Sequence, residues 1–356
     1  MGLALVGVTL VTLVLFIFLI ITKRQIDLLK NVKKQEDRER RHRLSKSLSS
    51  LKWGLAVSLV VVVITGSLAL FGGRTAKEIY LEHTHGLGFS SDGKRILIPA
   101  HDGLKAYEQG RWFTPEGAKH DYMGFSPVDE GFYSSGHPAP DSNLNNPFGI
   151  VKSLDEGKTL QSLALDGETD FHNMAVGYIS HVIYAYNPQP NSQMNKPGLF
   201  YSKNEGKTWT NSNIEGVSEE PTTIAVHPSE ASIVAIGTPT GVYLSKDFGN
   251  RFEKVMSVGQ NTSLFFNITG ELFIGGFQDG AYLVKMDLKN NKTEQLTIPA
   301  LTEDAVAYFA QNAIDDDQMA FTTFKNDVYY SIDKGVSWTK IADQGKSISY
   351  KDEEGK

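Results

Sequence analysis

The chain has 356 residues, enough to bury a sizeable hydrophobic core, and its composition is that of an ordinary globular protein. It contains no cysteine, which excludes disulfide bonds, thiolate metal ligands and cysteine nucleophiles. The net charge of −6 hides an asymmetry, because residues 23–52 hold 11 basic and 4 acidic residues, whereas residues 53–356 hold 24 basic and 37 acidic ones. Such an acidic main part argues against nucleic acid as a partner.

Two charge-free runs near the start of the chain, Gly2–Thr22 and Trp53–Gly73, are each 21 residues long. This is sufficient to cross the hydrocarbon core of a bilayer, which is about 30 Å thick. The first run follows no basic segment and ends without an A-x-A-like cleavage site, so it predicts a retained transmembrane helix rather than a signal peptide. The basic segment between the runs, expected to be a solvated helix, should stay in the cytoplasm. We therefore expect a multi-pass cell-membrane protein, anchored in the lipid bilayer, with everything after Gly73 on the extracytoplasmic side.

The remainder of the chain is organised by an internal repeat. Six segments combine a strand led by glycine, or once by aspartate, with a polar turn and then an aromatic or apolar residue. They begin at residues 103, 149, 198, 241, 280 and 327, so successive starts are 46, 49, 43, 39 and 47 residues apart. This period is typical of a four-stranded propeller blade. The sequence predicts an all-β fold, a six-bladed β-propeller, preceded by two transmembrane α-helices.

The predicted segments follow one another in a simple order. They are a first transmembrane helix (1–22), a basic cytoplasmic loop (23–52), a second transmembrane helix (53–73), a linker (74–82), the propeller (83–345) and a polar tail (346–356). Two segments could close the ring of blades. Either "KEIYLE" (77–82) or "SISYKD" (347–352) could add the strand that completes the edge of the propeller.

Four of the repeats share a turn of one design, written "SLDEGKT", "SKNEGKT", "SKDFGNR" and "SIDKGVS". Serine comes first, Asp or Asn two residues later, and glycine two residues after that. A short carboxylate or amide can accept hydrogen bonds from the turn's own backbone, and glycine supplies a position with positive φ. We assign this structural role to Asp155, Asn204, Asp247 and Asp333.

These turns, each followed by an aromatic or apolar residue, resemble the Asp-box (BNR) repeat, S/T-x-D-x-G-x-x-W/F. Propellers with this repeat form the sialidase/sortilin-like superfamily and are often labelled glycosyl hydrolases. The resemblance covers about residues 83–345 and implies the propeller fold. It also implies two kinds of activity, glycoside hydrolysis or the binding of peptides and proteins, as in sortilin-type receptors and propellers that assist membrane-complex assembly.

Six of the eight histidines of the propeller gather on one face of three adjacent blades. Loops that enter first strands and loops that join second to third strands share one face of a propeller, and six histidines fall in such loops. Neutral imidazole is a ligand of zinc and copper, and a nearby thioether favours Cu(I). The sequence predicts a copper or zinc site, held by a subset of His83, His85, His101, His120, His137 and His172, with Met123 and Met174 as further ligands. The alternative is that surface histidines collect in polar loops and make unrelated hydrogen bonds.

A glycoside-hydrolase-like function would depend on carboxylates as catalytic residues. Only four arginines follow the second apolar run, and none is predicted on the histidine face, so a sialidase-type arginine clamp is disfavoured. The catalytic candidates are Asp121, Asp170 and Glu303, and the two aspartates could instead orient or join the imidazoles. Three functions therefore stay open: a metal-binding propeller, a glycoside-hydrolase-like enzyme, and a metal-free propeller that binds an extracytoplasmic ligand or protein.

Overall fold

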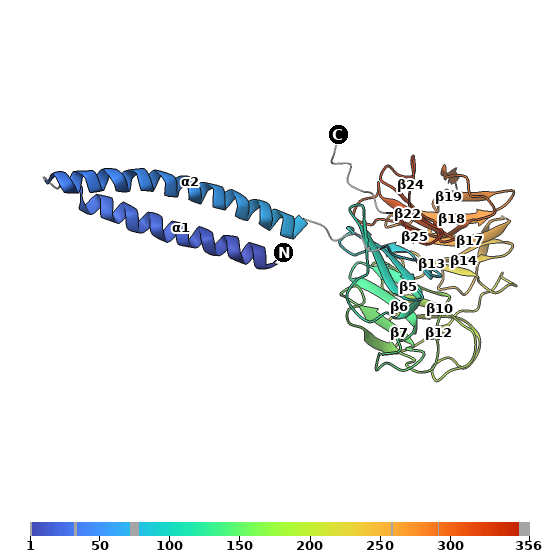
Figure 1. Ribbon diagram of the computed structural model, residues 1–356. Helices are drawn as coiled ribbons and strands as arrows, with labels where there is room; N and C mark the ends of the chain where they lie inside the picture. Colours follow the sequence, from blue (N-terminus) through green and yellow to red (C-terminus); the bar gives the residue numbers. More distant parts are fainter. Residues whose placement is uncertain (1, 32–33, 72–77, 258, 291, 349–356) are drawn as a thin grey trace. The chain divides into compact units, whose positions relative to one another are not determined.

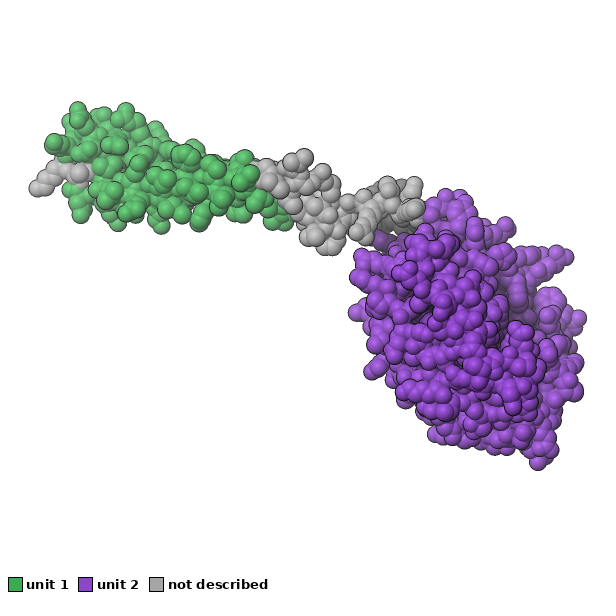
Figure 2. Space-filling model, turned by 90° about the horizontal axis from the view of Figure 1, so that it is seen from below, with its two compact units in different colours: residues 1–75 green, residues 76–356 purple. Residues whose placement is uncertain are grey.

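A computed structural model describes residues 2–31, 34–71, 78–257, 259–290 and 292–348. The end of the second predicted transmembrane run, most of the predicted linker and most of the predicted tail lie outside these residues. The chain forms two compact units, Met1–Thr75 and Ala76–Lys356 (Figure 2).

The first unit consists of two helices that pack against each other, α1 (Gly2–Leu28) and α2 (Gln35–Phe71) (Figure 1). Each is long and apolar enough to cross a membrane. Acidic Glu36 and Asp37 lie in the first turn of α2, where they complement the positive end of the helix dipole. Most of the basic segment is therefore helical, and α2 runs through it into the second apolar run.

The second unit is a six-bladed β-propeller, as predicted. Each blade is an antiparallel sheet in which strands that follow one another in the chain are neighbours. The first three blades comprise β1 (Gly88–Phe89), β2 (Ile96–Ala100), β3 (Gly103–Glu108) and β4 (Arg111–Phe113); β5 (Asp121–Val128), β6 (Gly131–His137), β7 (Ile150–Ser153) and β8 (Gln161–Ala164); and β9 (Met174–Val176), β10 (Ile183–Asn187), β11 (Gly198–Ser202) and β12 (Thr210–Asn211).

Blades four to six complete the ring. They comprise β13 (Thr223–Val226), β14 (Val234–Thr238), β15 (Gly241–Ser245) and β16 (Glu253–Met256); β17 (Gln260–Phe266), β18 (Leu272–Phe277), β19 (Ala281–Asp287) and β20 (Lys292–Gln295); and β21 (Val306–Gln311), β22 (Met319–Thr323), β23 (Val328–Ser331), β24 (Thr339–Asp343) and β25 (Lys346–Ser347).

The hydrophobic core lies between the blades. It divides into six clusters, one for each pair of neighbouring blades, and Ile98 and Ala320 belong to the cluster that joins blade one to blade six. Second strands such as β2, β14 and β22 are buried along their whole length. They therefore read as continuous apolar runs in the sequence, because both of their faces are covered by neighbouring blades.

Both of the segments proposed for ring closure take part in it. Leu81 N donates to Gly345 O (2.7 Å) and Ser347 N donates to Ile79 O (2.9 Å), so the start of the propeller chain pairs with β25. The Trp112 indole in blade one also donates to Ile341 O in blade six, at 2.8 Å. The ring is therefore closed by contacts between the two ends of the propeller chain.

The four serine-led turns have the same hydrogen bonds. In blade four, the buried Ser245 Oγ accepts from Gly249 N (2.9 Å), and Asp247 Oδ1 accepts from Arg251 N (3.0 Å) and Ser245 Oγ (2.7 Å). The Arg251 N–H holds the pKa of the Asp247 carboxyl below its usual value. The turns at Asp155, Asn204 and Asp333 repeat this pattern. The glycines have φ between 76° and 84°, which explains why only glycine is found there.

Candidate functional site: histidine–aspartate clusters beside a central cavity

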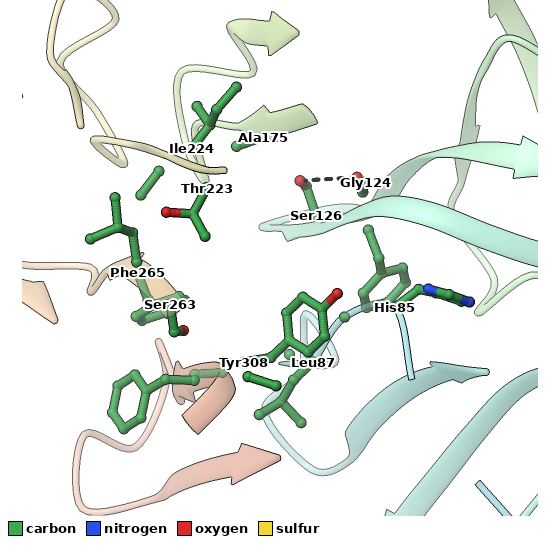
Figure 3. Close-up of a pocket in the computed structure, with 18 of the residues that line it drawn as sticks. His85, Leu87, Gly124, Ser126, Ala175, Thr223, Ile224, Ser263, Phe265 and Tyr308 are labelled. Carbon is green, nitrogen blue, oxygen red and sulfur yellow. Dashed lines mark hydrogen bonds between the residues drawn. The ribbon is translucent and has the colours of Figure 1, made fainter. Parts of the chain in front are cut away.

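The first strands of all six blades line a central cavity of about 570 Å³. Side chains of Thr223, Ser263 and Tyr308 contribute to its walls, together with His85 (Figure 3). Among the described residues that line it there are amides, hydroxyls, aromatic rings and aliphatic chains, but no Asp, Glu, Lys or Arg. The cavity is thus suited to uncharged ligands, with histidines as its ionisable groups.

Three of the predicted residues meet beside the cavity. His101 Nδ1 lies 3.2 Å from Asp121 Oδ2, and His85 Nε2 lies 3.6 Å from Asp121 Oδ1. Ligand atoms from all three residues lie within 4.8 Å of one another. We call this set the Asp121 cluster. It joins blades one and two, because His85 and His101 flank β1 and β2 whereas Asp121 begins β5.

Two atoms of the Asp121 cluster are buried without a hydrogen-bond partner, His85 Nε2 and Asp121 Oδ1. At 3.6 Å their separation is too long for a hydrogen bond. Burial lowers the pKa of His85, although Asp121 opposes this effect. Because a buried polar atom without a partner is costly, the cluster has capacity for a further group between these atoms.

His83 also reaches this cluster. Regular alternation along an extended segment would place the side chains of His83 and His85 on one side. His83 instead has φ of 46°, in the left-handed region, so the chain bends there. Both rings still contact His101, with centroid separations of 5.2 Å for His83 and 4.6 Å for His85.

A second set, the Asp170 cluster, joins blades two and three. Asp170 Oδ2 lies 3.2 Å from His137 Nε2 and 3.3 Å from His172 Nδ1. The other nitrogen of His137, Nδ1, lies 2.7 Å from Asn146 Oδ1. Sequence reasoning did not single out Asn146, which lies in a loop rich in Pro and Asn that offered only a weak signal.

Four other predicted residues lie apart from both clusters in the described structure. His120 is buried against Tyr122 and Phe148, and its Nδ1 accepts from Ala139 N at 3.0 Å. Because side chains alternate along a strand, His120 and its neighbour Asp121 point to opposite sides. The remaining three are Met123, which is buried, Met174, which packs between blades two and three, and Glu303, which is exposed before blade six.

No family model matches this chain, and no curated protein matches it. Solved structures do. A GH74 enzyme of Niastella koreensis has 13% identity and a TM-score of 0.50, over 75% of this chain and 46% of the enzyme. A gluconolactonase of Xanthomonas campestris has 11% identity and a TM-score of 0.50, over 68% and 84%. YCF48 bound to a D1 peptide has 12% identity and a TM-score of 0.45, over 74% and 83%.

These similarities define a class, the β-propeller proteins, and they show the fold alone. The chain spans less than half the length of the GH74 enzymes that it matches, at 46%. Its own function must therefore be argued from the residues beside its cavity.

Proposed function

We propose that this chain is a membrane-anchored, extracytoplasmic β-propeller that binds a divalent transition-metal ion through His85, His101 and Asp121. The observation that carries the proposal is the pair of buried, unpartnered atoms, His85 Nε2 and Asp121 Oδ1, with a second imidazole beside them. A metal ion between these groups would satisfy both atoms at once.

The spacing of the ligand atoms supports this assignment. Two ligands of one tetrahedral zinc ion, each about 2.0–2.2 Å from the metal, lie roughly 3.3–3.6 Å apart. Asp121 Oδ2 lies 3.2 Å from His101 Nδ1 and Asp121 Oδ1 lies 3.6 Å from His85 Nε2, so an ion at this spacing would be held by both carboxylate oxygens. Two imidazoles and one carboxylate suit Zn²⁺ or Cu²⁺. Because the proposed ligand set consists of two imidazoles and a carboxylate, we propose a divalent ion rather than Cu(I).

His85 lines the central cavity, whereas Asp121 lies behind it. A metal ion held by the buried Nε2 of His85 would therefore lie behind the wall of the cavity (Figure 3). Such a site could serve metal handling or the positioning of an uncharged partner.

The membrane anchor rests on the two N-terminal helices, which are long and apolar enough to span a bilayer. Residues 23–52, with 11 basic and 4 acidic residues, join the apolar runs. Basic loops of this kind are retained in the cytoplasm. This charge bias supports a two-span topology that places the propeller on the opposite side of the membrane.

The glycoside-hydrolase-like alternative has less support. Such enzymes use two carboxylates that flank the scissile bond. No carboxylate is found among the described residues of the cavity lining, and Asp121 and Asp170 each contact two imidazoles. The metal-free binding propeller keeps one observation in its favour, a cavity of about 570 Å³ without Asp, Glu, Lys or Arg among its described lining residues.

The metal content of the purified full chain in detergent tests the proposal. The chain is stripped with EDTA, loaded with Zn²⁺ or Cu²⁺, desalted and assayed by elemental analysis. We expect the wild type to retain about one tightly bound ion, and Asp121→Asn to lose it. The Cu²⁺ form should show hyperfine splitting from two imidazole nitrogens in its electron paramagnetic resonance spectrum.

His181→Gln is the matched control, because His181 pairs with Asp129 and belongs to neither cluster. It should retain the ion. Far-UV circular dichroism establishes that each variant is folded. A folded wild type that retains no ion would overturn the metal proposal and leave the metal-free binding propeller.

A further inference from the structure

We propose that the Asp170 cluster is a second site for the same class of ion, weaker than the first and adjacent to it. The inference rests on the proposed function for the class of ion, a divalent zinc- or copper-like cation. Its own support is the arrangement of His137, Asp170, His172 and Asn146.

The two clusters are built in the same way from successive blades. In each, a histidine that ends the second strand of one blade meets an aspartate at the entrance to the first strand of the next. These pairs are His101 with Asp121 and His137 with Asp170, each with a nitrogen–oxygen distance of 3.2 Å. The propeller repeat has thus placed the same imidazole–carboxylate pair at two neighbouring seams.

The hydrogen bond to Asn146 prepares His137 to act as a metal ligand. With Asn146 Oδ1 as its partner, His137 Nδ1 is the donor. In the neutral imidazole, Nε2 then carries a lone pair that faces Asp170 Oδ2 at 3.2 Å. Two acceptors face each other there, and a cation between them would relieve their repulsion. Histidines that ligate metals commonly donate their other N–H to an oxygen in this manner.

The second site should bind its ion more weakly, because its side chains are more exposed and its ligand atoms lie farther apart. The side chain of His172 is 63% exposed and that of Asp170 27%, compared with 19% for His85 and 16% for Asp121. Water screens charged ligands more effectively at an exposed site. Among the described residues, the Asp121 cluster is the only group of three or more histidines and carboxylates, with histidine included, whose ligand atoms all lie within 4.8 Å of one another. The exposed His172 must therefore rotate to complete the second site.

The two sites are close enough to interact. Asp121 of the first cluster and His137 of the second are register partners across β5 and β6. The Cα atoms of such partners lie about 4.5–5.5 Å apart. An ion captured at the exposed Asp170 cluster would thus be next to the more buried Asp121 cluster.

The test is an isothermal calorimetric titration with Zn²⁺. The full chain is kept in detergent and is first stripped of metal with EDTA. We expect two equivalents, the second bound at least 10-fold more weakly than the first. Asp170→Asn should lose only the weak equivalent, and Asp121→Asn only the tight one. In the Cu²⁺-loaded wild type, dipolar broadening of the resonance should appear with the second equivalent and be absent from both variants.

The matched control is Asp166→Asn, which removes an exposed carboxylate from the same loop, one that accepts from Asn145. It should keep both equivalents. His137→Gln provides a second route to loss of the weak equivalent if Asp170→Asn does not fold. One tight equivalent alone in the wild type, or a weak equivalent that survives in Asp170→Asn, overturns this inference but leaves the proposed function standing. No equivalent in the wild type overturns both.

Discussion

Asp121 and His137 are register partners of β5 and β6, yet each interacts with a different neighbouring blade. Asp121 contacts His101 of blade one at 3.2 Å, and His137 contacts Asp170 of blade three at 3.2 Å. Blade two is therefore the shared wall of both histidine–aspartate clusters. A change that disturbs the pairing of β5 with β6 should affect both clusters, whereas a substitution of Asp121 or of His137 alone should affect only its own cluster.

The stability of the metal-free protein should fall as the pH is lowered below about 6.5, the usual pKa of histidine. Burial lowers the pKa of His120 in the folded state, while Asp141 opposes this effect. Below the ordinary pKa the unfolded chain binds a proton that the folded chain does not, so protonation favours unfolding. One such group contributes at most about 1.4 kcal/mol per pH unit. Urea midpoints at pH 7.5 and 5.5, measured in EDTA, provide the measurement.

His120→Asn should weaken this pH dependence, because Asn can still accept from Ala139 N but does not titrate. The same substitution should leave metal binding unchanged, since His120 belongs to neither cluster. If the urea midpoints at pH 7.5 and 5.5 differ by as much in His120→Asn as in the wild type, His120 does not contribute to the pH dependence of stability.

Ser245→Ala should destabilise the propeller by about 1–3 kcal/mol, the cost of leaving a buried backbone donor unpaired. Ser245 Oγ is the acceptor of Gly249 N and the donor to Asp247, and the residue is 1% exposed. The measurement is the free energy of unfolding in urea. Ser257→Ala, an exposed serine outside the turn, is the control and should change stability little. Equal stability of the two variants would show that the turn's hydrogen bonds are dispensable.

Trp112→Phe should weaken ring closure. The Trp112 indole is 4% exposed and donates to Ile341 O at 2.8 Å, across the seam between blades one and six. Its loss removes one of two hydrogen bonds to Ile341 O, which still accepts from Ile348 N at 2.9 Å, so the cost should be about 0.5–1.5 kcal/mol. Hydrogen exchange should increase first in residues 79–89 and 339–347, and the urea midpoint should fall.

Trp209→Phe is the matched comparison, because the Trp209 indole N–H is buried without a partner. The same change there removes no hydrogen bond, so its cost should be smaller than that of Trp112→Phe. If both variants lose equal stability, packing rather than the seam hydrogen bond is responsible.

Because the chain contains no cysteine, single introduced cysteines can report on which side of the membrane each segment lies. Ser47→Cys places a thiol on the exposed basic part of α2, and Lys289→Cys places one on an exposed turn of blade five. In intact bacterial cells, a membrane-impermeant maleimide should label the cysteine at position 289 only. After permeabilisation it should label both. Labelling of the cysteine at position 47 in intact cells would refute the cytoplasmic placement of the basic segment.

The sequence predicted the fold well because the fold is a repeat. Local signals recur along the chain: a strand led by glycine in five of the six repeats, a serine-led turn with its own hydrogen bonds in four, and a largely buried second strand. Each signal involves residues within about one blade of one another, so spacing alone revealed the architecture. The two apolar helices were equally visible, since length and the lack of charge define them.

The site was predicted less completely. Blade topology was sufficient to place six histidines near one face, but side-chain direction at irregular strand ends was not. His83 adopts a positive φ that no local pattern announced, and His120 turns away from Asp121 into the seam between blades. Met123 and Met174 are buried, the latter between blades, and their role as ligands stays a prediction.

By itself, the sequence determined the repeat, the charge asymmetry, the lack of cysteine and the gathering of histidines in three blades. Only the tertiary structure decided which histidine meets which aspartate. The contacts of His85 and His101 with Asp121, and of His137 with Asp170, cross seams between blades, and each seam is set by the packing of whole sheets. No residue spacing encodes the 3.2 Å that separates His101 from Asp121, because the two side chains meet only after blades one and two have packed together.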